Sequence, residues 1–192
     1  MVKFPPYLPS AGWYKDWLKS FADGADDSNA IIYANEKGKV TRELARTLIK
    51  DASDRDLILS IAVEGGARQL RVGDKIKEIC LSEHGDWRHN HLNAIASAYG
   101  KKPFFPHIFP NLKNIYEDLT LIKLEDFNLN LHQLMVSWLM SSLKRDDFNL
   151  FQINSVLIER GKEYRAVINP KISLLDTIMN IGNESILGIS SL

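Results

Sequence analysis

The sequence lacks the features that mark several large classes of protein. It has one cysteine in 192 residues, which excludes an internal disulfide and a cysteine-based zinc site. No run approaches the roughly 18 apolar residues that a membrane span needs. Pro5, Pro6 and Pro9 interrupt the N-terminal apolar residues before they reach the length of a signal peptide. We therefore expect a cytoplasmic protein without membrane insertion.

An excess of one charge is also missing, because 24 basic residues stand against 24 acidic ones. Proteins that hold a nucleic-acid backbone or an anionic lipid surface usually carry a basic stripe. The sequence therefore predicts no nucleic-acid partner. It also contains no Gly-rich phosphate loop, no HExxH and no GxSxG motif, so it indicates no particular cofactor and no metal site.

What the sequence does have is the composition of one compact domain, which we assign to residues 1–192, with 45% apolar and 25% charged residues. Short apolar runs predict strands at 1–4, 30–34 and 75–82. Residues 41–63 allow either a helix followed by a strand or a β-hairpin. The prediction is an α/β or α+β fold, with a small N-terminal mixed sheet and packed helices.

From about residue 85 the apolar spacing is helical, and it stays helical to about residue 144. The exception is 101–110, where three prolines predict a loop. An earlier helix, at 11–21, has an aromatic face that we expect to pack on the core. Ser173 is placed to cap a short helix near the C-terminus, and residues 151–158 have the composition of a further strand.

Two side chains are candidates for proton transfer. His91 falls on the apolar face of its predicted helix, four residues after Trp87. A buried imidazole has a lowered pKa and can act as a general base near neutral pH, although it can also be a hydrogen-bonded core residue. Asp176 lies between apolar neighbours and needs a partner if it is buried. We take His91 and Asp176 as the candidate catalytic residues.

Three further residues are candidates for ligand binding. Arg88 and Arg46 carry guanidinium groups that can bind a carboxylate or phosphate. Arg42 lies one turn before Arg46 if this segment is helical, and on the same face if it is extended. Alternatively, these arginines are surface residues that are solvated or paired with acidic side chains. Tyr7 lies in a proline-rich turn at the end of the first predicted strand, where ligands often bind in open α/β sheets. The residue types of these candidates predict a small anionic ligand.

The order of motifs resembles that of the WbqC-like protein family. The resemblance rests on PPYLPS, on WRHNHLNAIASAYGKKPFF and on SLLDTIMNIGNES, in that order. The second segment matches the family's tryptophan–basic–x–x–histidine helix and Pro-Phe-Phe loop through these residues: Trp87, Arg88, His91, Tyr99, Pro103, Phe104 and Phe105. The third matches through Ser173, Leu175, Asp176, Gly182 and Glu184.

The sequence departs from the family pattern in the middle. Where the family usually has an Asn-Arg pair, this chain has Ala45 and Arg46, and Ala62 stands at an expected proline. The resemblance also favours the hairpin interpretation of residues 45–63. If this region contacts a ligand in the family, the activity of this chain is altered.

The resemblance implies a bacterial protein encoded among surface-polysaccharide genes. Its implied function is that of a transferase in O-antigen-like biosynthesis, with acyl or glycyl transfer to a sugar as one suggestion. The ligand would be a small anion or a sugar nucleotide. The alternative is a non-catalytic binding or assembly protein, with a protein partner, that retains the fold. A transferase requires its candidate side chains to line one pocket.

Overall fold

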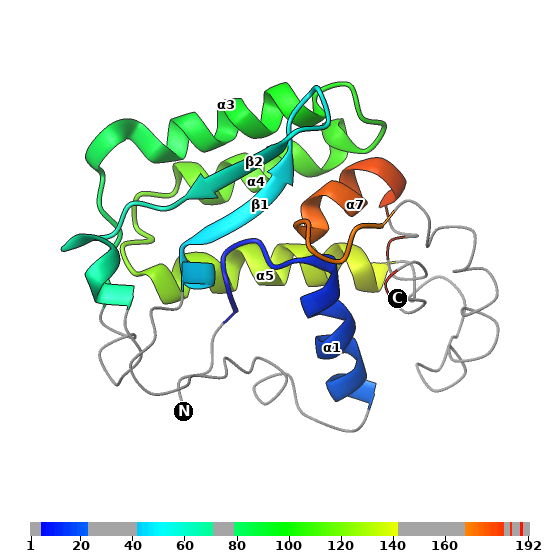
Figure 1. Cartoon of the computed structure of the whole chain (residues 1–192), viewed down its shortest axis with the longest axis horizontal. Coiled ribbons are helices and arrows are strands. Elements are labelled where there is room, and N and C mark those ends of the chain that lie inside the picture. The colour runs from blue at the N-terminus through cyan, green and yellow to red at the C-terminus, as the bar shows by residue number, and fades with distance from the viewer. Residues whose placement is uncertain are drawn as a thin grey trace.

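The computed structural model of the chain describes residues 5–22, 42–70, 79–141 and 168–182, together with Ser185 and Ile189. It is a mixed α/β fold (Figure 1). The main elements are α1 (Ala11–Ala22), β1 (Arg46–Lys50), β2 (Asp56–Ser60), α3 (Trp87–Tyr99), α4 (Phe105–Glu117), α5 (Leu124–Ser141) and α7 (Leu174–Ile181). Short 3-10 turns precede β1, at Arg42–Leu44, and α3, at His84–Asp86.

The β-hairpin interpretation of residues 45–63 is confirmed. Strands β1 and β2 pair antiparallel, with Arg46 opposite Ser60 at the open end and Lys50 opposite Asp56 at the turn. The Asp51 carboxylate closes the turn because it accepts hydrogen bonds from backbone N–H groups two and four residues on. The outer edge of β1 is also occupied, since Ser173 N–H donates to the Leu48 carbonyl at 2.8 Å.

The other predicted strands are not seen as strands in the described part of the chain. Residues 1–4, 30–34 and 151–158 lie outside the described residues. Of 75–82 only the last four are described, and there Cys80 and Leu81 make isolated bridges to Lys123 and Val63. The described sheet therefore has two antiparallel strands, whereas a mixed sheet was expected.

The helical prediction is confirmed for residues 85–141, with one correction at the prolines, and its last residues, 142–144, lie outside the described part of the chain. Residues 105–110 were expected to be a loop, but they form the first turns of α4. Pro106 lies in the first turn, where a missing N–H costs nothing, and Pro110 removes one internal hydrogen bond. Burial of the apolar face of α4, through Ile108 and Leu112, offsets that loss.

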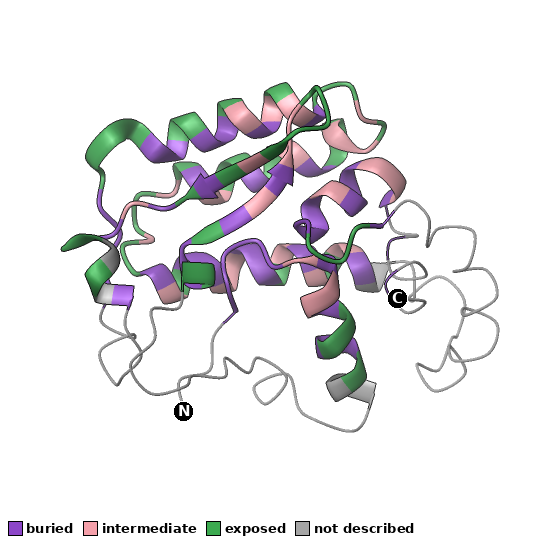
Figure 2. Cartoon of the chain, viewed as in Figure 1, coloured by how far each residue is buried: buried purple, intermediate pink, exposed green. Residues whose placement is uncertain are grey.

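The core lies between the hairpin and the helices (Figure 2). Tyr14 and Trp17 of α1 are buried, as the aromatic spacing predicted, whereas the side chain of Phe21 lies outside the described residues. A buried polar group ties the N-terminal turn to the hairpin, because the Asn128 amide donates to the Pro5 and Leu44 carbonyls. Consecutive helices α3, α4 and α5 pack against one another.

Ser173 caps α7 as predicted, and Gly182 ends it. The Ser173 hydroxyl accepts a hydrogen bond from Leu175 N–H at 3.2 Å. Gly182 has φ +58° and ψ −133°, a conformation that is essentially restricted to glycine. A Cβ at this position would also overlap the ring of Phe104. The contact between the end of α7 and the Phe104 ring therefore requires glycine.

We expect Gly182→Ala to lower the free energy of unfolding by about 3 kcal/mol, since backbone strain and steric overlap act together. The matched control is Gly85→Ala, because Gly85 also has a positive φ but has open space around its Cβ position. It should lose only about 1 kcal/mol. Urea denaturation of both variants measures the difference, and equal losses would contradict the overlap.

Candidate functional site

A cavity with several polar and charged side chains lies at the open end of the hairpin. It has a volume of about 680 Å³, and we call it the arginine cavity. Its walls come from the start of β1, the end of β2 and the loop after β2. The lining residues are Arg42, Ala45, Arg46, Ser60, Ile61, Ala62, Val63, Glu64, Gly65, Gly66, Leu70, Ser82 and His84.

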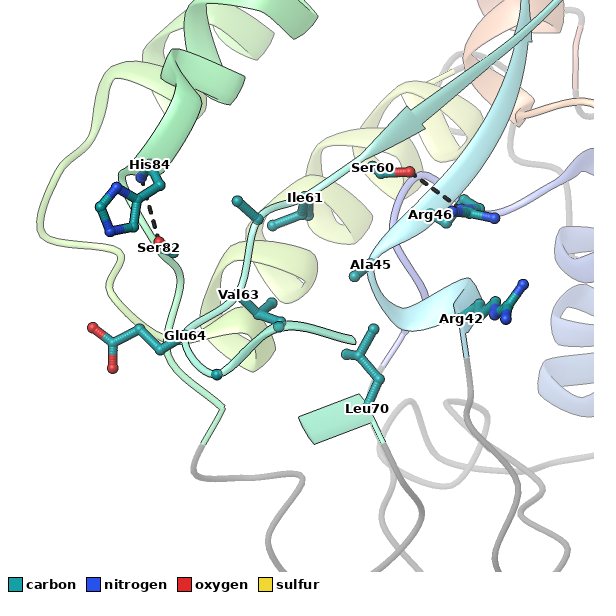
Figure 3. A pocket seen from close by; sticks show the side chains of 13 residues that line it. Arg42, Ala45, Arg46, Ser60, Ile61, Val63, Glu64, Leu70, Ser82 and His84 are labelled. Carbon is teal, nitrogen blue, oxygen red and sulfur yellow. Dashed lines mark hydrogen bonds between the residues drawn. The ribbon is translucent and has the colours of Figure 1, made fainter. Parts of the chain in front are cut away.

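The charged side chains of this cavity are separated along its length (Figure 3). Arg42 and Arg46 lie at one end and extend in the same direction, whereas His84 and Glu64 lie at the other end. All four are exposed. The guanidinium of Arg46 is oriented by its Nε, which donates to Ser60 Oγ at 3.2 Å.

The hairpin fixes this geometry. Ile61 N–H donates to the Ala45 carbonyl at 2.8 Å, which continues the strand pairing past Ser60 and holds the two walls together. Two glycines with positive φ then turn the chain, and Gly66 N–H donates to the Val63 carbonyl at 3.0 Å. The cavity is therefore built on paired backbone, with the arginines at the strand end.

His91 does not line this cavity but lies directly behind it. The ring is 6% exposed, and its Nδ1 is 2.8 Å from the Tyr7 hydroxyl. The other ring nitrogen faces the Ser60 carbonyl. Burial lowers the pKa of His91 to about 4, so the imidazole is neutral at pH 7. The Tyr7 hydroxyl also contacts that of Tyr116.

Because a carbonyl can only accept, the nitrogen of His91 that faces Ser60 carries the proton. His91 thus contacts the Ser60 backbone carbonyl on the core side of the strand. The Ser60 hydroxyl accepts a hydrogen bond from Arg46 on the cavity side. The imidazole is therefore placed to position the cavity wall, and it has no access to a ligand within the cavity.

The Arg88 side chain is also buried, and its hydrogen bonds are made within the protein. It is 7% exposed, and its terminal nitrogens donate to the carbonyl oxygens of Tyr116, Asp118 and Leu121. Its Nε donates to Glu83 at 3.2 Å. The guanidinium also lies 5.0 Å from the ring centroid of Trp87. These contacts direct Arg88 to the α4–α5 connection and away from the arginine cavity.

The five predicted site residues therefore do not converge. Tyr7 and His91 are brought together in the core, and Arg46 lies in front of them at the arginine cavity. Arg88 is enclosed, and Asp176 lines a separate cavity beside α7. Tyr7 also borders a second cavity, of about 340 Å³, that shares Arg46 with the first.

Sequence reasoning gave less weight to the other residues of the arginine cavity. Arg42 was visible as a cation near Arg46, but a solvated surface role was the favoured interpretation of that pair. His84 was visible only as one of three histidines close in the sequence, and Glu64 and Ser82 gave no signal, because pairing of residues 62–64 with 80–82 is what brings these segments together.

A model of the WbqC-like protein family matches residues 5–148, so the chain belongs to this family. No curated protein and no solved structure matches the chain. Among the described residues no cluster of His, Cys, Asp and Glu could hold a metal ion. No helix in that part of the chain is long and apolar enough to span a membrane.

A second neutral histidine is buried at the interface of α1 and α5. His132 stacks on Tyr14, and its Nδ1 is 3.1 Å from the Tyr14 hydroxyl. Burial lowers the pKa of His132 to about 4, as it does for His91. Unfolding raises both values towards 6.5, so the unfolded chain binds more protons below that pH.

Stability should therefore fall as the pH drops from 6.5 to 4, by about 3 kcal/mol for each buried histidine. Replacement of His132 by Phe keeps an aromatic ring but removes the titrating group. We expect its unfolding free energy, from urea denaturation between pH 7 and 4, to fall by about 3 kcal/mol less than that of the wild type. The exposed-site control His89→Gln should follow the wild-type profile, and a His132→Phe profile parallel to the wild type would refute this account.

Proposed function

We propose that the protein is a transferase of bacterial surface-polysaccharide biosynthesis that binds a sugar nucleotide in the arginine cavity. The observation that carries the proposal is the pair Arg42 and Arg46 at one end of a cavity of about 680 Å³. Two guanidinium groups at the same end of one cavity suit a diphosphate, which offers several acceptor oxygens. The volume falls within the range of about 300–1,000 Å³ that small-ligand sites occupy.

The position of the family motif supports the same cavity. Ala45, Arg46 and Ala62 occupy the places where the resemblance leads one to expect Asn, Arg and Pro, and all three line the cavity. The arginine is retained, which keeps the charge that an anionic ligand needs. The alanine at position 45 removes an amide, so in this chain polar recognition at that wall falls to Arg46.

The opposite end of the cavity provides groups for the sugar and for proton transfer. In the proposed acyl or glycyl transfer, an amine or hydroxyl of the sugar attacks the acyl carbon. The bond from that carbon to its leaving group breaks, and the attacking atom gives up a proton. We assign the proton acceptor to His84, which lines the cavity, in place of His91, which is enclosed behind it.

The alternative is a non-catalytic binding or assembly protein. An interface would be favoured by a broad exposed apolar face. In the described part of the chain, the exposed large apolar residues are Ile58 on β2 and Leu119 and Ile122 between α4 and α5. Ile58 lies on a different element from Leu119 and Ile122, so the three do not by themselves define one broad face, and the transferase remains our proposal.

Binding is tested with UDP-N-acetylglucosamine as the probe, measured by calorimetry. Arg46→Ala and Arg42→Ala should each weaken binding at least tenfold, because each removes a charged hydrogen-bond donor from the diphosphate. Arg55→Ala is the matched control, since Arg55 is exposed at the far end of the hairpin, beside Asp51. A loss of the same size in Arg55→Ala, or no binding by the wild type, would overturn the proposed site.

Transfer is tested separately, with UDP-glucosamine as the acceptor and acetyl coenzyme A or a glycyl thioester as the donor. Mass spectrometry should detect the N-acylated sugar nucleotide while the thioester bond is consumed. His84→Ala should bind UDP-glucosamine as tightly as the wild type but form product at least 100-fold more slowly, since general-base catalysis contributes about 10²–10⁴-fold. Binding without product from either donor would favour the non-catalytic alternative.

A further inference from the structure

A smaller cavity lies at the other end of the hairpin, and we call it the Asp176 cavity. It has a volume of about 280 Å³ and is bordered by the β1–β2 turn, the C-terminal end of α3 and α7. The hairpin register separates it from the arginine cavity, because Lys50 and Asp56 pair at this end and Arg46 and Ser60 at the other. The two cavities share no lining residue.

The Asp176 carboxylate forms one wall of this cavity. It lies in the first turn of α7 and is half-buried, and burial raises its pKa. Among the described residues it forms no ion pair and accepts no well-aligned hydrogen bond. A carboxylate removed from water in this way is costly unless a donor or a cation meets it.

The Tyr99 hydroxyl is a second unsatisfied group on the same wall. Tyr99 is 1% exposed, and no described group gives its hydroxyl a hydrogen bond of acceptable geometry. The hydroxyl faces the Asp176 carboxylate, so the two polar groups converge on one point of the cavity. The hydroxyl can supply only one donor to the carboxylate, so Asp176 keeps lone pairs for a further hydrogen-bond donor in the cavity.

Two of the other charged side chains at this cavity form ion pairs with residues of the hairpin. Lys50 pairs with Asp56 at 2.8 Å, and Asp51 pairs with Arg55 at 2.8 Å. Lys102 also lines the cavity, and its charge acts on the Asp176 carboxylate although the two form no ion pair in the described structure. Asp54 lines the cavity as well, so the groups that form no ion pair in the described structure are the Asp176 and Asp54 carboxylates and the Lys102 ammonium.

We propose that the Asp176 cavity binds a small zwitterion, a free α-amino acid, whose ammonium donates to Asp176 and Tyr99 while its carboxylate accepts from Lys102. A zwitterion brings a cation to the half-buried Asp176 and an anion to Lys102, whereas the third charged group, Asp54, is exposed to solvent. The volume is slightly below the usual range for drug-sized ligands and is too small for a nucleotide. The proposal goes beyond the transferase assignment, because it uses none of the residues of the arginine cavity.

The test is calorimetric titration of the full chain with L-alanine. The wild type should bind it, whereas Asp176→Asn should bind at least tenfold more weakly, since it replaces the carboxylate with a neutral group of the same shape. Tyr99→Phe should weaken binding about fivefold, through loss of one hydroxyl. N,N,N-trimethylglycine, which has no N–H donor, should fail to bind the wild type.

Lysine variants provide the matched control. Lys102→Gln should weaken L-alanine binding at least fivefold, and Lys101→Gln, its exposed neighbour outside the cavity, should leave binding unchanged. Thermal denaturation establishes that each variant is folded. Absence of alanine binding by the wild type, equal binding by folded Asp176→Asn, or equal binding of trimethylglycine would overturn the proposal.

The two sites are tested independently. Arg46→Ala should bind L-alanine like the wild type, and Asp176→Asn should bind UDP-N-acetylglucosamine like the wild type. Loss of alanine binding in Arg46→Ala would overturn the assignment of a separate amino-acid site, whereas failure of sugar-nucleotide binding alone would affect only the proposed function.

Discussion

The hydrogen bonding of one neutral imidazole connects most of the fold. His91 lies on α3 between the Ser60 carbonyl at the end of β2 and the Tyr7 hydroxyl of the N-terminal turn. Because the carbonyl only accepts, the ring must donate there and accept from Tyr7. The Tyr7 hydroxyl also contacts the Tyr116 hydroxyl of α4. These contacts link four segments that are distant in the sequence.

The side chains that the sequence suggested for catalysis and ligand binding on α3 therefore hold other segments of the fold in place. His91 secures the hairpin, and Arg88, one turn before it on α3, secures the α4–α5 connection through three backbone carbonyls. A guanidinium can do this since its donors radiate from one plane. The family's tryptophan–basic–x–x–histidine segment is thus an internal scaffold in this chain. The polar groups that can meet a ligand lie outside it, on the Ser60 side of the hairpin and beside Asp176.

Local signals were sufficient where a residue's neighbours in sequence are also its neighbours in space. The aromatic face of α1 and the Ser173 cap followed from spacing of this kind, whereas spacing left the hairpin open against a helix and a strand until the family resemblance favoured it. The prolines led to a wrong prediction of a loop at residues 105–110, for a physical reason. The rule that proline ends a helix assumes an isolated segment, whereas here burial of Ile108 and its neighbours outweighs the single hydrogen bond that Pro110 removes.

The sequence by itself determined the fold class, the burial of His91 and the family, since each depends on periodicity or on a motif contained in a short stretch. Only the tertiary structure decided which polar groups share a cavity. Arg46 and His84 are joined at one cavity through strand pairing and a bridge between Val63 and Leu81, while Asp176 meets Tyr99 at another. Side-chain type fixes what a group can do, but its partners depend on long-range packing that no local pattern encodes.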